Sequence, residues 1–168
     1  MGEKTSSVDA VVAELFEQEG ARLVRMARFF VDDRTAAEDL VQEAFIRLAR
    51  SAHRLRDRDR AAAYLRAIVL NLARDHNRRG LVSLRHRPPA DPAPASVEEQ
   101  VAARSDQQAV VAALGQLPRR QRDCLVLRYY LELSVPEIAE TMGLSANSVK
   151  THLQRGLRAL EQRLGSDR

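Results

Sequence analysis

The chain has 168 residues, of which 45% are hydrophobic and 30% are charged, and its single cysteine excludes an internal disulfide. No apolar run reaches the roughly 18 residues that cross a bilayer, and no secretory signal is visible, so we expect a cytoplasmic protein without membrane insertion. The net charge of +4 favours polyanions as partners.

Charged side chains are distributed unevenly along the chain. Residues 1–49 contain ten acidic and six basic side chains. Residues 50–87 contain eleven arginines against three aspartates, and residues 147–168 contain five basic and two acidic side chains. We therefore expect an acidic first segment and two separate basic zones, one in each half of the molecule.

Apolar periodicity predicts three helices in the first half of the chain. Apolar residues between Val8 and Phe30, including Phe16, recur at three- and four-residue steps. This spacing predicts one amphipathic helix or a pair of helices. A second apolar stripe predicts a helix over 35–52, where Thr35 and Glu38 have the spacing of a capping box. A third predicted helix covers 61–78.

A proline-rich segment divides the chain into two parts. Four prolines between Arg85 and Ser96 are incompatible with a helix and favour an extended path. We place the linker at 81–97, between a first domain at 1–80 and a second at 98–168. No strand pattern is visible, so the predicted fold is all-α, with two small helical domains joined by the Pro-rich linker.

The second domain begins with two predicted helices. The first runs from Val97 to Leu114, and the second has Pro118 in its first turn and ends near Tyr130. Cys124 lies in an apolar stretch of the second helix, which predicts a buried structural thiol.

The clearest local signals lie between residues 134 and 164. Ser134 and Glu137 have the spacing of a capping box, and Pro136 fits the first turn of the same short helix. Gly143 can adopt the left-handed conformation that ends this helix, and Ser145 can cap the next one. Two helices joined so closely form a helix-turn-helix, whose second helix enters the major groove of DNA. Duplex DNA is therefore the leading partner.

The second helix of this motif, about 146–163, has an apolar stripe that must pack inward. The positions left outside are polar or basic, and none is acidic: Asn147, Lys150, Thr151, Gln154, Arg155 and Arg158. Such side chains bind base edges and phosphates. The alternative is an ordinary solvated face, which the caps, the turn and the lack of acids disfavour.

A different polar face lies opposite the apolar stripe of the 35–52 helix. It consists of Asp39, Gln42, Glu43 and Ile46, at steps of three, one and three residues. Acidic and amide groups beside an exposed isoleucine are typical of a protein-docking surface. A solvated helix face explains the spacing equally well, so the residues alone leave both interpretations open.

A basic loop and helix form the third group. The alternating charges of 53–60 predict an exposed loop, followed by Tyr64 and by polar positions of the next helix. Arginines beside an aromatic and an amide suit phosphates and unstacked bases. Tyr64 also fits the core stripe, and packing alone explains it as well. The polar positions of that helix are Arg66, Asn71, Arg74 and Arg78.

Signals of catalysis are poor. The four histidines have no metal-ligand spacing, and no glycine-rich phosphate loop is present. We predict no metal, no cofactor and no enzymatic activity.

Two motifs resemble those of one known family. Residues Ala37–Phe45 resemble the core-binding motif of region 2 of bacterial RNA polymerase sigma factors. Residues Leu117–Tyr130, followed by Ser134–Leu164, resemble region 4. The order and spacing of both motifs make the chain similar to the extracytoplasmic-function (ECF) group of sigma factors, from about Leu15 to Leu164.

The resemblance implies a protein that recruits core RNA polymerase to promoter DNA. Asp39, Gln42 and Glu43, with Ile46 beside them, would dock on the clamp coiled coil of the largest polymerase subunit. The residues implied for the −10 promoter element are Arg56, Arg58, Tyr64, Asn71, Arg74 and Arg78. Those implied for the −35 element are Asn147, Lys150, Thr151, Gln154 and Arg155.

The family also suggests an anti-sigma factor as a further partner. A free-standing helix-turn-helix repressor or activator that binds DNA as a dimer is the alternative function. Such a regulator would have no use for the motif at Ala37–Phe45.

Overall fold

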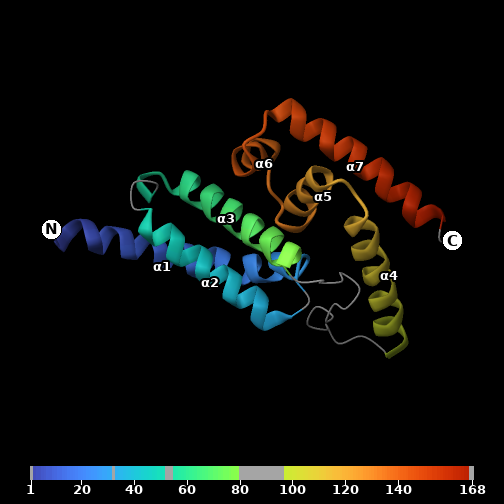
Figure 1. Ribbon diagram of the computed structural model, residues 1–168, viewed down its shortest axis with the longest axis horizontal. Helices are drawn as coiled ribbons and strands as arrows, with labels where there is room; N and C mark the ends of the chain where they lie inside the picture. The colour runs from blue at the N-terminus through green and yellow to red at the C-terminus, as the bar shows by residue number, and fades with distance from the viewer. Residues whose placement is uncertain (1, 32, 52–54, 80–96, 167–168) are drawn as a thin grey trace.

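The computed structural model describes residues 2–31, 33–51, 55–79 and 97–166, and every regular element in these ranges is helical (Figure 1). The first half contains α1 (Gly2–Ala27), α2 (Arg34–Arg50) and α3 (Arg58–Arg79). The second half contains α4 (Val97–Gly115), α5 (Arg119–Leu125), the π-helical turn η2 (Val126–Tyr130), α6 (Val135–Met142) and α7 (Ala146–Ser166). The predicted all-α fold is confirmed. Of the predicted linker, all but Val97 lies outside the described residues.

The first three helices pack against one another around a shared apolar core. Helix α1 contacts both α2 and α3, and α2 contacts α3. The largest fully buried side chains include Leu23 and Phe30 from the α1 segment, Leu48 from α2 and Leu65 from α3. Burial of each such side chain stabilises the fold by roughly 1.5–3 kcal/mol. The predicted stripes therefore form the core, with Phe16 as an exception described below.

Helix α2 begins at a different cap from the predicted one. Asp33 is the N-cap, and its carboxylate accepts a hydrogen bond from the backbone N–H of Thr35 at 3.0 Å. Thr35 itself lies in the first turn, and Glu38 pairs with Arg34 at 2.8 Å instead of closing a capping box. The predicted box at Thr35 and Glu38 was therefore wrong. Aspartate caps a helix at least as well as threonine does, so the cap falls two residues earlier.

Helix α3 also begins earlier than predicted. The carboxylate of Asp57 accepts hydrogen bonds from the backbone N–H groups of Asp59 at 3.0 Å and Arg60 at 3.4 Å. Residues 58–60 are therefore the capped first turn of α3, and the loop prediction was wrong for them. Residues 52–54 of that loop lie outside the described residues.

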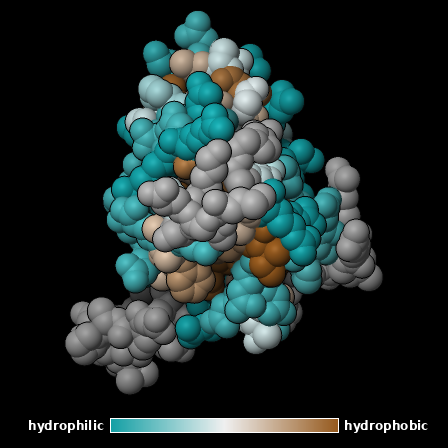
Figure 2. Space-filling model, turned by 90° about the vertical axis from the view of Figure 1, so that its left-hand side faces the viewer, coloured by the Kyte–Doolittle hydropathy of each residue, from teal (hydrophilic) through white to brown (hydrophobic). Residues whose placement is uncertain are grey.

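The end of the molecule that carries the start of α1 is mostly hydrophilic, with isolated apolar patches (Figure 2).

The second group of helices is organised around α7, which contacts α4, α5 and α6. Pro118 is the residue before α5, with an extended ψ of 139°, and does not lie in the first turn as predicted. The predicted single helix up to Tyr130 is α-helical only to Leu125 and continues as the π-helical turn η2. Cys124 is buried, as predicted, and burial raises the pKa of its thiol to about 11.

The predicted helix caps and turn of the helix-turn-helix are confirmed. The Ser134 hydroxyl accepts a hydrogen bond from the Glu137 backbone N–H at 3.3 Å, and the Glu137 carboxylate accepts one from the Ser134 N–H at 2.7 Å. Gly143 ends α6 in the left-handed conformation, at φ 65°. The Ser145 hydroxyl then accepts a hydrogen bond from the Ser148 backbone N–H at 3.1 Å and so caps α7.

Candidate nucleic-acid interface and protein-docking surface

Helix α7 presents the predicted DNA-binding side chains on its surface. The side chains of Asn147, Lys150, Thr151, Gln154 and Arg155 are all exposed, whereas Val149 and Gly156 are buried on the other side. The Thr151 hydroxyl donates to the carbonyl oxygen of Asn147 at 3.0 Å, so its donor is already satisfied within the helix. The exposed face therefore combines amide, hydroxyl and cationic groups, which suit base edges and phosphates.

Close packing against α5 fixes the position of α7. A Cβ atom placed on Gly156 would lie 3.0 Å from Cδ1 of Leu125 and 3.4 Å from Cβ of Gln121. The absence of a side chain at residue 156 thus lets the two helices approach closely. This contact holds the exposed face of α7 at a defined angle to the rest of the second group.

The predicted docking face of α2 is also on the surface. Asp39 and Gln42 are exposed, and the Ile46 side chain is 47% exposed, which is unusual for an isoleucine. Glu43 is half-buried and pairs with Arg47 at 2.9 Å. The four side chains therefore form a face of mixed acidic, amide and apolar character, called the α2 face below.

The residues implied for the −10 element are spread along α3. Arg56 is exposed just before the helix, and Arg58 in its first turn pairs with Glu14 at 3.0 Å. Tyr64 is half-buried, with its hydroxyl 3.5 Å from that of Ser51, so it contributes to packing. Helical geometry places the first turn of α3 about 20–25 Å from the exposed Asn71 and from Arg74. The side chain of Arg78 lies outside those that the structure describes.

Arg74 differs from the rest because its guanidinium is engaged by the second group of helices. Its side chain is only 16% exposed and forms an ion pair with the fully buried Asp123 of α5. The same guanidinium donates to the side-chain oxygen of Asn71 at 3.2 Å. Periodicity placed Arg66 and Arg74 on the polar side of α3. The prediction was wrong for Arg66, which is only 7% exposed and pairs with Glu19 of α1 at 3.6 Å. For Arg74, periodicity carried no information about a partner 49 residues away.

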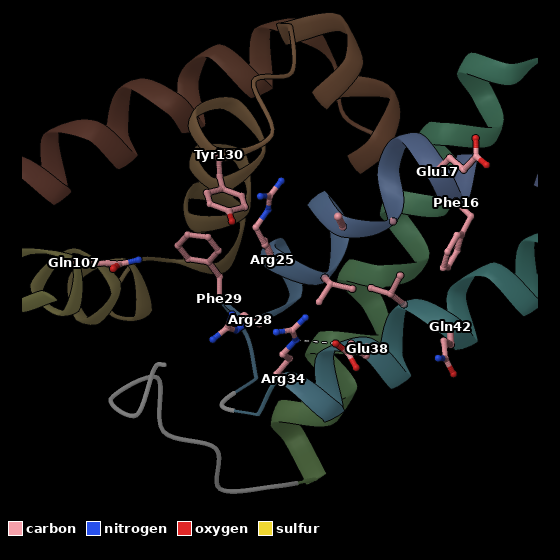
Figure 3. A pocket seen from close by; sticks show the side chains of 14 residues that line it. Phe16, Glu17, Arg25, Arg28, Phe29, Arg34, Glu38, Gln42, Gln107 and Tyr130 are labelled. Carbon is pink, nitrogen blue, oxygen red and sulfur yellow. Dashed lines mark hydrogen bonds and ion pairs between the residues drawn. The ribbon is translucent and has the colours of Figure 1, made fainter. Parts of the chain in front are cut away.

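A hollow of about 720 Å³ lies beside the α2 face (Figure 3). Phe29 and Tyr130 form one wall, and Gln42 lies at the opposite end. The two aromatic rings pack edge to face, with 4.6 Å between their centroids. Phe16 also lines the hollow and is 54% exposed, although its spacing predicted a core position. The Phe16 ring packs on that of Phe45, with 5.2 Å between the ring centroids. One side of the Phe16 ring therefore contacts the core, and the other faces solvent.

Within the described residues, no three His, Cys, Asp or Glu side chains are grouped so that they could hold a metal ion. None of the helices in these ranges is long and apolar enough to cross a membrane.

Comparison with known families defines the class of the protein. Residues 15–80 match Sigma-70 region 2, and residues 107–160 match Sigma-70, region 4. The first match covers α2 and α3 with the second half of α1, and the second covers the helix-turn-helix. Two such regions on helical domains define a bacterial transcription initiation factor.

Individual relatives refine this class. The RNA polymerase sigma-E factor of Streptomyces avermitilis is 33% identical over 144 residues, which cover 86% of this chain and 79% of the relative. The ECF RNA polymerase sigma factor SigL of Mycobacterium tuberculosis is 29% identical over 167 residues, with 95% and 93% coverage. The solved structure of CnrH in complex with the cytosolic domain of CnrY superposes with a TM-score of 0.69, at 29% identity and with 99% and 96% coverage. The chain belongs to the ECF RNA polymerase sigma factors.

Proposed function

We propose that this chain binds core RNA polymerase through the α2 face and directs it to promoters by contacts to −10 and −35 elements. One observation carries this proposal. The first domain of this chain displays the mixed α2 face. The second domain contains a capped helix-turn-helix, and the predicted DNA-binding positions of α7 carry amide, hydroxyl and cationic side chains. A DNA-binding module alone has no need of the first surface.

The α2 face suits a protein partner. An exposed isoleucine flanked by carboxylate and amide groups provides apolar contact area together with charge for orientation. The clamp coiled coil of the largest polymerase subunit is the surface that we assign to it. The hollow beside this face adds Phe16 as a further apolar contact.

The −35 element is assigned to α7. Asn147 and Gln154 have amide groups that pair with adenine edges, whereas Lys150 and Arg155 add contacts to phosphates or guanine. Thr151 lies between them on the same face. A well-formed bidentate contact of this kind discriminates between bases by about 1–3 kcal/mol.

The −10 element is assigned to α3 and the residues before it. Arg56 and Arg58 would contact the DNA backbone near the start of the helix, with Tyr64 beside an unstacked base. Asn71, Arg74 and Arg78 would follow the strand along the second half of α3. In this proposal the chain makes no bond itself and acts in the cytoplasm, where the polymerase carries out the chemistry.

A protein regulator is part of the proposal. The CnrH structure contains the cytosolic domain of CnrY, and this chain is 29% identical to CnrH. We assign to this chain an anti-sigma factor that covers the α2 face and thereby competes with the polymerase. A free-standing dimeric repressor or activator is disfavoured, because it leaves the α2 face without a role.

Transcription in vitro tests the proposal. Purified chain and core polymerase are incubated with a genomic DNA library, and the 5′ ends of the transcripts are sequenced. We expect start sites that share two upstream motifs and that depend on the chain. The proposal is overturned if the chain does not change where the polymerase starts, or if the chain alone binds duplex promoter DNA as tightly as the holoenzyme does.

A further inference from the structure

Two neighbouring residues of α5 hold the two helices of the helix-turn-helix. Cys124 contacts Met142 at the end of α6, where its thiol donates a weak hydrogen bond to the Met142 thioether at 3.4 Å. The next residue, Leu125, lies close to Gly156 of α7. Helix α5 is therefore the common support of both helices, and Figure 1 shows it close to both.

Met142 lies at the start of the turn that leads to the DNA-binding helix. It is the last residue of α6, and Gly143 follows it in the left-handed conformation. Helix α7 begins shortly afterwards, at Ala146. The contact of Met142 with Cys124 thus attaches the turn before α7 to the helix that supports it.

The two sulfur atoms of this contact differ in their access to solvent. Cys124 is 0% exposed, whereas Met142 is partly exposed. Burial raises the pKa of the Cys124 thiol to about 11, and the neighbouring Asp123 carboxylate adds to the effect. The thiolate, which is the form that oxidants attack, is therefore scarce at neutral pH. A thioether needs no deprotonation, so Met142 is the more reactive of the two sulfur groups.

Few other sulfur atoms compete for an oxidant. The chain has three methionines and one cysteine. Met26 of α1 is 0% exposed in the core of the first domain. Between the two methionines whose side chains the structure describes, Met142 is therefore the one that a dissolved oxidant can reach.

We propose that Met142 is a site of reversible oxidation by hydroperoxides and that its sulfoxide weakens DNA binding by α7. A lone pair of the Met142 sulfur attacks the hydroxyl oxygen of the hydroperoxide. An S–O bond forms, the O–O bond breaks, and the proton of the transferred hydroxyl passes to the departing oxygen, which leaves as water or an alcohol. The sulfur loses an electron pair and the hydroperoxide gains it. The DNA target in this proposal rests on the proposed function.

The added oxygen weakens the packing of α6 on α5. A sulfoxide is polar and needs a hydrogen-bond donor, whereas the Cys124 thiol that faces the sulfur is only a weak one. If the oxygen stays in the contact, it lacks an adequate donor, which costs free energy. If it turns toward water, it pulls the Met142 side chain away from Cys124. Either outcome loosens the turn before α7, so the DNA-reading face of α7 loses its fixed angle.

The α2 face does not depend on this contact. Its four residues contain no sulfur, and they lie in the first domain. Oxidation of Met142 should therefore leave the affinity for core polymerase unchanged while it lowers the affinity of the holoenzyme for promoter DNA. The two affinities separate a local effect on the helix-turn-helix from general damage to the chain.

Single substitutions remove each described sulfur in turn. Met142→Leu retains the volume and apolar character of the side chain but cannot form a sulfoxide. Met26→Leu is the matched control in the first domain. Cys124→Ala tests whether the thiol is the oxidised group instead. All three variants retain Met1, so any effect of oxidation at Met1 would persist in Met142→Leu.

The experiment treats the full chain with hydrogen peroxide and then removes the peroxide with catalase. Peptide mass spectrometry follows sulfoxide formation at each methionine. Urea denaturation measures the stability of the treated chain, and fluorescence anisotropy measures binding of a promoter duplex by holoenzyme assembled with untreated core polymerase. Half of each sample is first reduced with methionine sulfoxide reductases A and B, one for each epimer.

We expect peroxide to oxidise Met142 at least about tenfold faster than Met26. The oxidised chain should unfold at a lower urea concentration, and its holoenzyme should bind the promoter at least about fivefold more weakly. Both changes should be reversed by the reductases. Met142→Leu should resist peroxide, whereas Met26→Leu and Cys124→Ala should be as sensitive as the wild type.

Several results would overturn the proposal. One is oxidation of Met142 no faster than that of Met26, and another is a Met142 sulfoxide that changes neither stability nor promoter binding. Sensitivity of Met142→Leu equal to that of the wild type, or resistance of Cys124→Ala, would also do so. If a variant fails to fold by circular dichroism, recovery of the wild type by the reductases decides, because these enzymes reduce methionine sulfoxide.

A failure of the proposed function gives a different result. Absence of start sites that depend on the chain would refute the function. The relative rates of oxidation at Met142 and Met26, together with the urea midpoints, would still decide whether Met142 is the oxidation site.

Discussion

Gly156 of α7 lies so close to Leu125 of α5 that an added Cβ would be 3.0 Å from the leucine Cδ1 atom. Leu125 is buried, so it has little room to move away. The packing of the DNA-binding helix on its support thus depends on the absence of a side chain at one position.

Replacement of Gly156 by valine should therefore destabilise the second domain. Overpacking of this kind costs about 1–3 kcal/mol of the free energy of unfolding, more than any gain in helix propensity. Gly165→Val is the matched control, because no heavy atom lies within 4 Å of a Cβ at that position. Urea denaturation followed by circular dichroism measures both. Equal stability of the two variants would show that Leu125 moves aside freely.

Reversal of charge at Glu43 should abolish polymerase binding but leave the fold intact. The side chains of the Glu43–Arg47 pair are about half exposed, and an i,i+4 pair of this kind contributes only about 0.3–0.5 kcal/mol, so the melting temperature should hardly change. A like charge placed in a protein interface costs several kcal/mol, equivalent to at least about a hundredfold loss of affinity. Glu161→Lys, an exposed position on α7, is the control. Unchanged affinity of Glu43→Lys for core polymerase would remove the α2 face from the docking assignment.

Two substitutions in α7 should have different effects on the −35 element. Gln154→Ala should relax the base preference at one position by about 1–3 kcal/mol. Lys150→Ala should weaken binding to all sequences and reduce the slope of log K against log salt by about 1. Holoenzyme binding to a panel of single-base promoter variants at several salt concentrations separates the two. Identical effects of both substitutions would contradict the assigned roles.

The capping box should make the stability of α6 depend on pH. The hydrogen bond from the Ser134 backbone N–H lowers the pKa of Glu137 below its ordinary value of 4.5. Because the folded-state pKa is the lower one, the stabilisation is present above pH 4.5 and is lost as the pH falls through the folded pKa. Glu137→Gln should therefore be less stable than the wild type near neutral pH, and the difference should shrink on acidification. If the difference in stability between Glu137→Gln and the wild type did not change with pH, the stabilisation would not come from the charge of the Glu137 carboxylate.

Local chemistry explains why the helix-turn-helix could be predicted. Its caps and turn depend on residues within four positions of one another, such as Ser134 with Glu137, and on the freedom of Gly143 to adopt a positive φ. The same kind of reasoning failed at Thr35, because two good capping residues lay close together and the backbone used Asp33.

Contacts between distant segments explain what could not be predicted. The spacing of Phe16 is that of a core residue, but its ring packs on Phe45 while the residue stays 54% exposed. Arg74 fits the polar side of α3, and only the fold places Asp123 opposite it. Periodicity identifies the faces of one helix but not which neighbour, if any, lies against each face.

Because Val126–Tyr130 form a π-helical turn, the number of residues in this segment determines the direction in which the following side chains point. A π turn holds one residue more than an α turn, so deletion of one residue would restore a regular helix. Residues beyond the deletion would then rotate by about 100° around the helix axis. Tyr130 would turn away from Phe29, and the buried Leu131 that follows it would turn as well. A change of one residue in chain length at this turn would thus alter how the two halves of the molecule fit together.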